Sequence, residues 1–252
     1  MSSRGKANES ADQTAGGGAA GAGGRRRAAV GRAPGAGPET VPTPPGDARI
    51  TWHPAVPAVP ARCVLALGHG AGGGIEARDL AALAAELPGR GVHVALVEQP
   101  WRVAGKKLAP APRTLDAGWS ALWPRLAAPG LPVVAGGRSA GARVACRTAA
   151  ELGAAAVLAL AFPLHPPGRP ERSRAGELLD AAAAAPLLVV QGGADPFGRP
   201  SEFPAGRRPV EVPHADHGFA VPKRAATTQE EALAVLVDAV TGWLAGLGRA
   251  ED

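Results

Sequence analysis

A serine flanked by glycines is the residue best placed to act as a nucleophile in this chain. The segment Gly137-Arg138-Ser139-Ala140-Gly141 follows the apolar run 131–135 and precedes a helix-like stretch, 142–152. At a strand-to-helix junction this pattern forms a nucleophile elbow, a turn so tight that the serine backbone is strained and its Oγ stands clear of the sheet. The same string arises by chance in a chain with 35 glycines, so the strand and helix around it are what favour a nucleophile.

Asp195 is the candidate acid partner. It lies in Gln191-Gly192-Gly193-Ala194-Asp195-Pro196-Phe197-Gly198, directly after the apolar run 187–190. This position would bring its carboxylate to the same sheet edge as Ser139, in the chain order nucleophile, acid, histidine that follows a serine elbow. An aspartate before proline is also a common turn signal.

His217 is the candidate base. An imidazole can take the serine proton and later return it to the leaving group near neutral pH, because its ordinary pKa is about 6.5. Two histidines, His214 and His217, follow Asp195. We favour His217 because Gly218 and Phe219 follow it, a hinge and an apolar anchor that would fix the ring.

The glycine-rich loop 68–74, after the apolar run 63–67, is the candidate oxyanion loop. Acyl transfer builds negative charge on the carbonyl oxygen, and backbone N–H groups aimed at it stabilise that charge. We expect these donors from Ala140 and Ala71. The alternative is a dinucleotide site, since Gly68, Gly70 and Gly73 spell G-x-G-x-x-G, but it leaves the serine elbow unexplained.

Taken together, these motifs resemble the alpha/beta-hydrolase-like domain found in small bacterial proteins, in a testis-expressed protein and in a subunit of a chromatin acetyltransferase complex. The resemblance spans roughly residues 62–247 and implies the fold, the triad Ser139, Asp195 and His217, and kinship with dienelactone hydrolases and small esterases. It implies no particular substrate, and it leaves open a non-catalytic scaffold role. The strings that carry it are His69-Gly70, residues 136–141, Phe162-Pro163-Leu164-His165-Pro166-Pro167-Gly168, residues 191–198 and Asp216-His217.

The substrate is expected to meet four further side chains. The loop 99–113 carries Trp101 and four cations, Arg102, Lys106, Lys107 and Arg113. It would attract an anionic acyl group if it lined the mouth of the site, and otherwise it is a solvated basic loop. A metal site is not expected, because His214 and His217 have no third ligand nearby. The predicted substrate-binding residues are His69, Trp101, Arg138 and His165. His165, a lone histidine between prolines, is equally suited to a structural role.

Alternating strands and helices predict an α/β fold with a mostly parallel sheet of about six to seven strands and helices on both faces, and the resemblance implies that this is the alpha/beta-hydrolase fold. Continuous apolar runs are typical of parallel strands buried on both faces. Only about 25 residues separate Phe162 from Leu187, so we expect a minimal lid and an open site for a small acyl substrate. The expected strands are 63–67, 93–97, 132–135, 157–162, 187–190 and 210–212, with a possible edge strand at 50–52.

Composition predicts two regions. Residues 1–48 are mostly Gly, Ala, Arg, Pro and Ser, a mixture that buries too little surface to fold, so we expect a disordered tail. Residues 49–252 are then one alpha/beta-hydrolase domain, long enough for a sizeable core. Residues 50–252 carry 20 basic and 18 acidic side chains, a balance that disfavours nucleic-acid binding.

The remaining expectations concern compartment and partners. Cys63 and Cys146 fall in a strand and a helix, so they are expected to be buried and reduced. With no apolar run long enough to span a membrane and no signal-peptide pattern, we expect a cytoplasmic protein that does not bind membranes. We expect a small-molecule acyl substrate and no cofactor, and the oligomeric state stays open.

Overall fold

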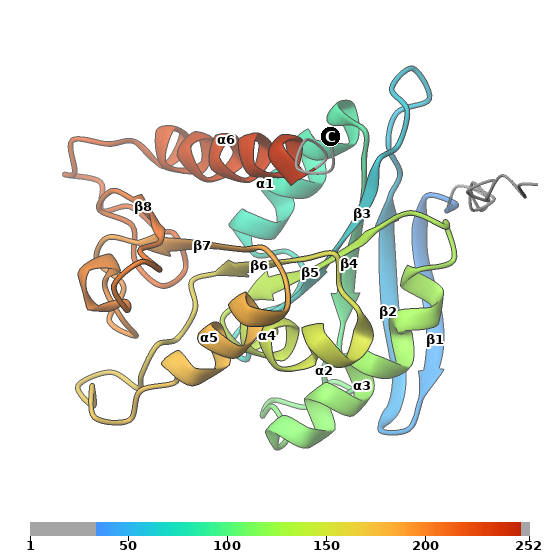
Figure 1. Cartoon of the computed structure of the whole chain (residues 1–252), viewed down its shortest axis with the longest axis horizontal. Coiled ribbons are helices and arrows are strands. Elements are labelled where there is room, and N and C mark those ends of the chain that lie inside the picture. The colour runs from blue at the N-terminus through green and yellow to red at the C-terminus, as the bar shows by residue number, and fades with distance from the viewer. Residues whose placement is uncertain (1–33, 248–252) are drawn as a thin grey trace, which may run out of the picture.

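The computed structural model describes residues 34–247, which fold around one mixed β-sheet (Figure 1). The strands are β1 (Gly37–Thr43), β2 (Gly46–His53), β3 (Cys63–Gly68), β4 (Val92–Glu98), β5 (Val133–Arg138), β6 (Ala156–Leu160), β7 (Leu187–Gly192) and β8 (Val210–Val212). The helices are α1 (Arg78–Glu86), η1 (Leu87–Arg90), α2 (Pro100–Val103), α3 (Pro112–Leu126), α4 (Ala140–Leu152), α5 (Ala175–Ala184), η2 (Pro200–Glu202) and α6 (Gln229–Leu247).

The sheet has the strand order β1-β2-β4-β3-β5-β6-β7-β8. Strands β3 to β8 pair in parallel, whereas β2 pairs antiparallel with both β1 and β4. The carboxyl ends of the parallel strands therefore share one edge, where the loops of an open α/β sheet build their sites. The α/β prediction is confirmed, and the sheet has eight strands rather than six or seven.

The extra strand is β1, and it corrects the predicted boundary at residue 48. Gly37–Thr43 pairs with Gly46–His53 along its whole length, so the folded region begins before residue 49. Its burial alternates between exposed and intermediate, and one of its side chains, Val41, packs against the core, so pairing with β2 is the main contribution that holds it in place. Proline is tolerated in such an edge strand, so composition alone hid it. Residues 1–33 of the predicted tail lie outside the described residues.

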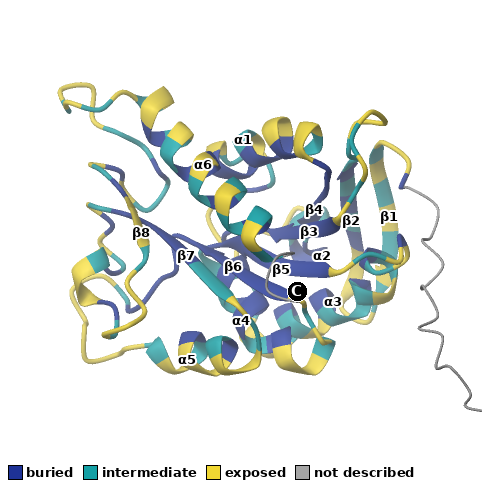
Figure 2. Ribbon diagram, turned by 45° about the horizontal axis from the view of Figure 1, so that its top comes forward, coloured by how far each residue is buried: buried dark blue, intermediate teal, exposed yellow. Residues whose placement is uncertain are grey.

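The core consists of two apolar layers, one on each side of the sheet. Strand β3 supplies both layers, because alternate side chains point to opposite faces: Val64 and Ala66 enter one cluster, and Leu65 and Leu67 enter the other. All residues of β3, β5 and β6 are buried, and Figure 2 shows the central strands in dark blue beneath helices that are exposed only outward. This is the environment that their apolar sequences predicted.

Helices cover both faces, as expected. In Figure 1, α1 and α6 lie above the sheet, and α3, α4 and α5 lie below it. The described residues include no lid domain, because only residues 161–174 connect β6 to α5. None of the helices within residues 34–247 has the length and hydrophobicity needed to cross a bilayer.

Both cysteines are free and buried. Burial raises the pKa of Cys63 to about 11 and that of Cys146 to about 12, which keeps both thiols protonated at neutral pH. Neither is a reactive nucleophile in this state, so Ser139 has no competitor among the cysteines.

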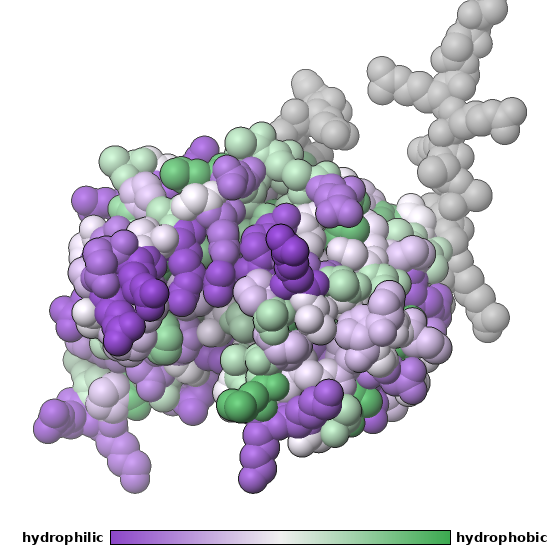
Figure 3. Space-filling view, turned by 90° about the horizontal axis from the view of Figure 1, so that it is seen from below, coloured by the Kyte–Doolittle hydropathy of each residue, from purple (hydrophilic) through white to green (hydrophobic). Residues whose placement is uncertain are grey.

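The surface is mixed. On the face shown in Figure 3, hydrophilic and hydrophobic side chains are interspersed, and the longest projecting groups are hydrophilic.

Candidate active site

Ser139 lies between strand β5 and helix α4, with φ 52° and ψ −111°. A positive φ is strained for a residue with a Cβ, and it turns the serine side chain out of the strand path. The Ser139 N–H donates to the carbonyl oxygen of Leu160 at 2.9 Å, which ties the turn to the neighbouring strand β6. The structure thus forms the elbow that the motif predicted.

Glycine is needed on both sides of the elbow because the carboxyl end of β3 packs directly against it. A Cβ at Gly137 would stand 2.5 Å from the carbonyl oxygen of Gly68, and a Cβ at Gly141 would collide with the same carbonyl. These glycines bring Ser139 and the glycine-rich loop together.

Asp195 lies in the loop after β7 and is fully buried. Its Oδ1 accepts from the N–H of Phe197 at 2.8 Å, and its Oδ2 accepts from Nε2 of Gln191 at 2.8 Å. Gln191 Nε2 also lies 3.2 Å from the carbonyl of Phe162 and 2.9 Å from that of Gly198. Gln191 is a positioning residue that motif reading missed, because a strand-end glutamine has no distinctive spacing.

His217 connects the acid to the serine. Its Nδ1 lies 2.8 Å from Oδ2 of Asp195, and its Nε2 lies 2.8 Å from Oγ of Ser139. A carboxylate accepts, so Nδ1 carries the proton and Nε2 is free to accept from the serine hydroxyl. The structure brings together the three residues predicted as a triad, from the loops after β5, β7 and β8.

His214, the other histidine that follows Asp195, is not part of this hydrogen-bonded triad. His214 is exposed, with φ 61°, and contacts neither Ser139 nor Asp195 by a hydrogen bond. The ring of His217 instead lies against Phe197, with ring centroids 4.2 Å apart. Phe197 covers the base and was not predicted, while Phe219, the expected anchor, is fully buried beneath the loop.

The predicted oxyanion donors lie on the two segments that meet at the elbow. Ala140 is the first residue of α4, so its N–H has no partner within the helix. Ala71 is exposed in the turn after Gly70, and a Cβ at Gly70 would lie 3.4 Å from Cβ of Ser139. Within residues 34–247, neither N–H donates a hydrogen bond, so both remain available to an oxyanion.

His69 holds this loop and also lines a small space beside Ala140, but its ring nitrogens are bonded to the protein rather than free for a substrate. Its Nε2 accepts from the N–H of Gln99 at 3.1 Å, and its Nδ1 donates to the carbonyl of Gly70 at 2.8 Å. Burial lowers the pKa of His69, and the neutral ring is also the form that satisfies both bonds. Both nitrogens are therefore used by the protein.

Arg138 likewise has a protein partner on each side. Its Nε donates to Oδ2 of the fully buried Asp79 at 3.1 Å, and its Nη2 donates to the carbonyl of His217 at 2.6 Å. Burial raises the pKa of Asp79, and the charge of Arg138 opposes that rise. We predicted a substrate contact for Arg138, but its hydrogen bonds link helix α1 to the histidine loop.

His165 has the structural role, which was one of the two expected for it. It is 6% exposed, its Nδ1 lies 2.9 Å from the carbonyl of Pro166, and its Nε2 lies 3.2 Å from Oε1 of Glu202. The His165 N–H donates to the carbonyl of Phe197 at 3.0 Å. These contacts brace the loop that carries Asp195, so the residue supports the acid and does not reach Ser139 by a hydrogen bond.

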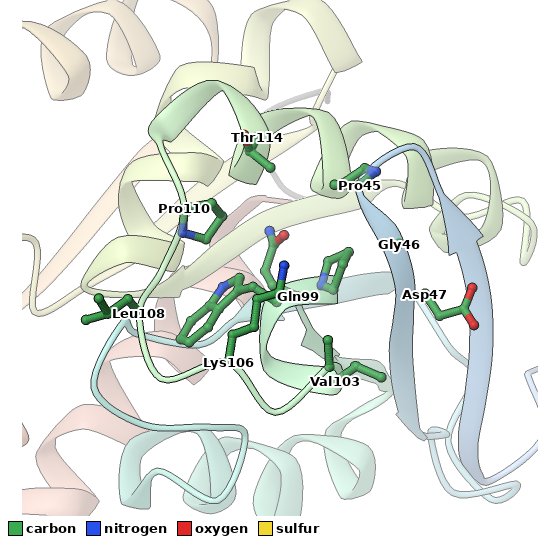
Figure 4. A pocket seen from close by; sticks show the side chains of 12 residues that line it. Pro45, Gly46, Asp47, Gln99, Val103, Lys106, Leu108, Pro110 and Thr114 are labelled. Carbon is green, nitrogen blue, oxygen red and sulfur yellow. The ribbon is translucent and has the colours of Figure 1, made fainter.

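Trp101 lines two spaces beside the oxyanion loop. One is a slot of about 10 Å³ that Ala140 and Gly70 also line. The other is a cavity of about 330 Å³ between the β1–β2 turn and the segment 99–114. Figure 4 shows the Lys106 side chain lying across this cavity toward Gln99, whereas Asp47 points away from it.

The four cations of the loop 99–113 have different surroundings. Lys106 lines the cavity, while Arg102 lies 3.6 Å from Glu76 in an ion pair. Lys107 and Arg113 are exposed and line neither of these two spaces. In the part of the chain that the structure describes, no His, Cys, Asp and Glu side chains group in a way that could hold a metal ion.

Solved structures share this fold across most of the chain. The serine hydrolase XC6422 of Xanthomonas campestris, described as lacking a lid, superposes with a TM-score of 0.61 at 19% identity, covering 85% of this chain and 95% of that one. A dienelactone hydrolase of Anabaena variabilis gives 0.61 at 18% identity, covering 86% and 98%. Est1E of Butyrivibrio proteoclasticus gives 0.60 at 13% identity, covering 83% and 100%.

Sequence comparison gives the family. No curated protein matches the chain significantly. The family model described as alpha/beta hydrolase domain matches residues 61–245, which include the elbow, the acid loop and the histidine loop. The chain belongs to the alpha/beta hydrolase domain family.

Proposed function

We propose that this protein is a serine hydrolase that cleaves a small ester, thioester or lactone through an acyl-enzyme intermediate. The observation that carries the proposal is the position of His217, 2.8 Å from both the acid Asp195 and the nucleophile Ser139. Such a chain of hydrogen bonds activates a serine hydroxyl, and it requires no cofactor.

In the acylation step, Nε2 of His217 takes the proton of Ser139 as Oγ attacks the substrate carbonyl. Asp195 stabilises the imidazolium that forms, and the N–H groups of Ala71 and Ala140 donate to the oxyanion. His217 then passes the proton to the leaving group. Water, activated by the same histidine, hydrolyses the acyl-serine and regenerates the enzyme.

Ala140 is suited to its part because it begins a helix of 13 residues. Its N–H lies at the positive end of the helix dipole, which favours negative charge in front of it. Among the described residues only the short connection 161–174 lies where a lid would be inserted, so the site favours small or exposed acyl groups. We further propose a small-molecule substrate and a cytoplasmic location, in keeping with two free cysteines.

The test is reaction with a fluorophosphonate probe together with hydrolysis of p-nitrophenyl acetate. We expect the wild-type protein to be labelled, and Ser139→Ala to lose both labelling and turnover, with kcat falling by about 10⁶ while the fold survives. His217→Ala should lose nearly as much, whereas His214→Ala, its exposed neighbour, should keep its activity.

Two results would contradict the proposal. Labelling that persists in Ser139→Ala would show that another residue is the nucleophile. A folded wild-type protein that reacts with neither reagent would favour a non-catalytic scaffold.

A further inference from the structure

The slot and the cavity beside the oxyanion loop are separated by very little protein. Of the residues that line them, Gln99 and Trp101 are common to both. The slot is bounded by Gly70 and Ala140 on the oxyanion side and by Leu115, Trp119 and Val144 on the inner side. An acyl group bound through its oxyanion to Ala140 would have this slot next to it.

The slot is very small. Its volume of about 10 Å³ is close to the ~10–15 Å³ that one water molecule needs, so it has room for no more than a methyl group, which is the part of an acetyl group beyond its carbonyl. Its inner walls are rigid, because Trp119 and Val144 are almost fully buried in the core and close-packed cores do not widen without cost.

Of the two residues that separate the spaces, Gln99 is held firmly. Its Nε2 donates to the carbonyl of Leu115 at 3.1 Å, and its N–H donates to Nε2 of His69 at 3.1 Å. Trp101 is held by packing, with its ring 5.6 Å from that of His69 and only 5% of the residue exposed. Of the side chains between the slot and the cavity, the indole ring of Trp101 is therefore the one whose removal would join the two spaces.

The cavity on the other side is much larger, at about 330 Å³, and Val103, Leu108 and Pro110 are among the residues that line it. Leu108 is 84% exposed, which makes it the most exposed large apolar side chain of the described region. An alkyl chain that passed Trp101 would lie against these apolar side chains and alongside the side chain of Lys106, which crosses the cavity (Figure 4).

We propose that Trp101 sets the acyl-length limit of this enzyme by separating a methyl-sized slot from a larger, mostly apolar cavity. The inference rests on the proposed serine hydrolase function and names its substrate class, the short-chain acyl esters. A smaller side chain at position 101 would join the slot to the cavity and admit medium-length acyl chains.

The experiment measures kcat/KM for p-nitrophenyl acetate, butyrate, hexanoate and octanoate. Wild-type protein should prefer acetate. Trp101→Ala should shift the preference toward the longer esters, by about fourfold for each methylene that enters the cavity. Trp101→Leu, which removes less of the core, should shift it in the same direction and guards against loss of folding in the alanine variant.

Trp123→Leu is the matched control, because this partly buried tryptophan packs against the same core cluster but lines neither space. It should leave the chain-length profile as in wild type. Titration with a fluorophosphonate counts the active sites in each preparation, so that rates refer to folded enzyme.

The outcomes separate the two proposals. If wild-type protein is labelled and cleaves acetate but both Trp101 variants keep the wild-type chain-length profile, the proposed role of Trp101 is wrong and the proposed hydrolase function stands. A wild-type preference for octanoate over acetate would also contradict the proposed role of Trp101, but not the proposed hydrolase function. If wild-type protein is neither labelled nor active on any ester, the proposed function falls and the inference falls with it.

Discussion

At the scale of single residues, the candidate base is held from three sides. Asp195 accepts from its ring at 2.8 Å, Phe197 lies against the ring face, and Arg138 donates to its backbone carbonyl at 2.6 Å. Arg138 directly precedes Ser139 in the chain, so one residue connects the nucleophile turn to the histidine loop. Its guanidinium is itself oriented by the buried carboxylate of Asp79.

We therefore predict that Arg138 acts as a positioning residue. Arg138→Gln should lower kcat by about tenfold to a hundredfold through misplacement of His217, with little change in KM for a small ester. Asp79→Asn should have the same kinetic effect and also lower stability, by about 3–5 kcal/mol, because it leaves a buried cation without its partner. Steady-state kinetics and thermal melts measure both effects.

Arg143→Gln is the control for Arg138. Arg143 also forms an ion pair through two nitrogens, with Glu177 at 2.5 and 2.9 Å, but it lies on α4 away from the histidine loop. Its loss should leave kcat unchanged. If Arg138→Gln raised KM and kept kcat, the arginine would be a substrate contact after all.

His69 gives a prediction about pH. Burial lowers its pKa in the folded protein, while the unfolded chain takes up a proton near the ordinary value of about 6.5. The neutral ring's contribution to stability is thus fully present above about pH 6.5 and is lost as the pH falls below it toward the lowered pKa. The melting temperature should fall over that range, and His69→Asn should show a smaller fall.

Some pH dependence should remain in His69→Asn, because burial also lowers the pKa of His93, which acts with the same sign. An identical slope in wild type and variant would show that folding does not lower the pKa of His69.

At the scale of elements, the β1–β2 hairpin closes one side of the fold and of the 330 Å³ cavity. Strand β1 contributes Glu39, whose carboxylate accepts from Nε of Arg125 at 2.6 Å and from the indole N–H of Trp52 at 3.2 Å. It also completes the hydrogen bonding of β2, which would otherwise be an unprotected edge.

A pair of truncations tests this role. A chain that begins at residue 46 lacks β1, and it should melt at a lower temperature and associate more readily than a chain that begins at residue 34. Both chains lack residues 1–33, so the difference between their melting temperatures reports on residues 34–45, which contain β1. Equal melting temperatures and equal solubility would mean that β1 adds nothing to the sheet.

At the scale of the whole molecule, the sheet assembles the site by bringing together loops that are far apart in the chain. The loops after β5, β7 and β8 carry Ser139, Asp195 and His217, and the loop after β3 carries the oxyanion segment. All four follow the carboxyl ends of parallel strands. Because β3 and β5 are buried throughout and β7 is buried at its carboxyl end, the core fixes the relative positions of the loops that follow them.

Charge acts at the same scale, and here we predict a weak effect. Residues 50–252 are nearly balanced, and Arg102 is paired with Glu76, so little long-range field is left to steer an anionic ester. With kcat/KM measured well below saturation, a neutral ester should show no salt dependence and an anionic one only a slight dependence. Lys106→Gln should abolish that slight dependence.

A steep loss of rate with salt for the anionic ester alone would contradict this expectation. It would restore the predicted role of the loop 99–113 in attracting an anionic acyl group, since ions screen such fields over about 8 Å at physiological ionic strength.

The sequence by itself determined the fold class and the three residues of the candidate triad. Continuous apolar runs identify buried parallel strands, and glycines around Ser139 identify the elbow, because both are local consequences of residue type. The chain order placed Asp195 and His217 after it. The preference for His217 over His214 also came from local sequence, and the structure places only the former against Ser139.

Tertiary structure decided what the polar side chains around the site contact. His69, Arg138 and His165 have residue types that suit substrate binding, but their partners, Gln99, Asp79 and Glu202, are distant in the sequence. The strand β1 was hidden for a similar reason, since pairing with β2 stabilises it rather than its own apolar content. Local patterns encode backbone shape and burial, whereas the partner of a polar group depends on which loops the folded sheet brings together.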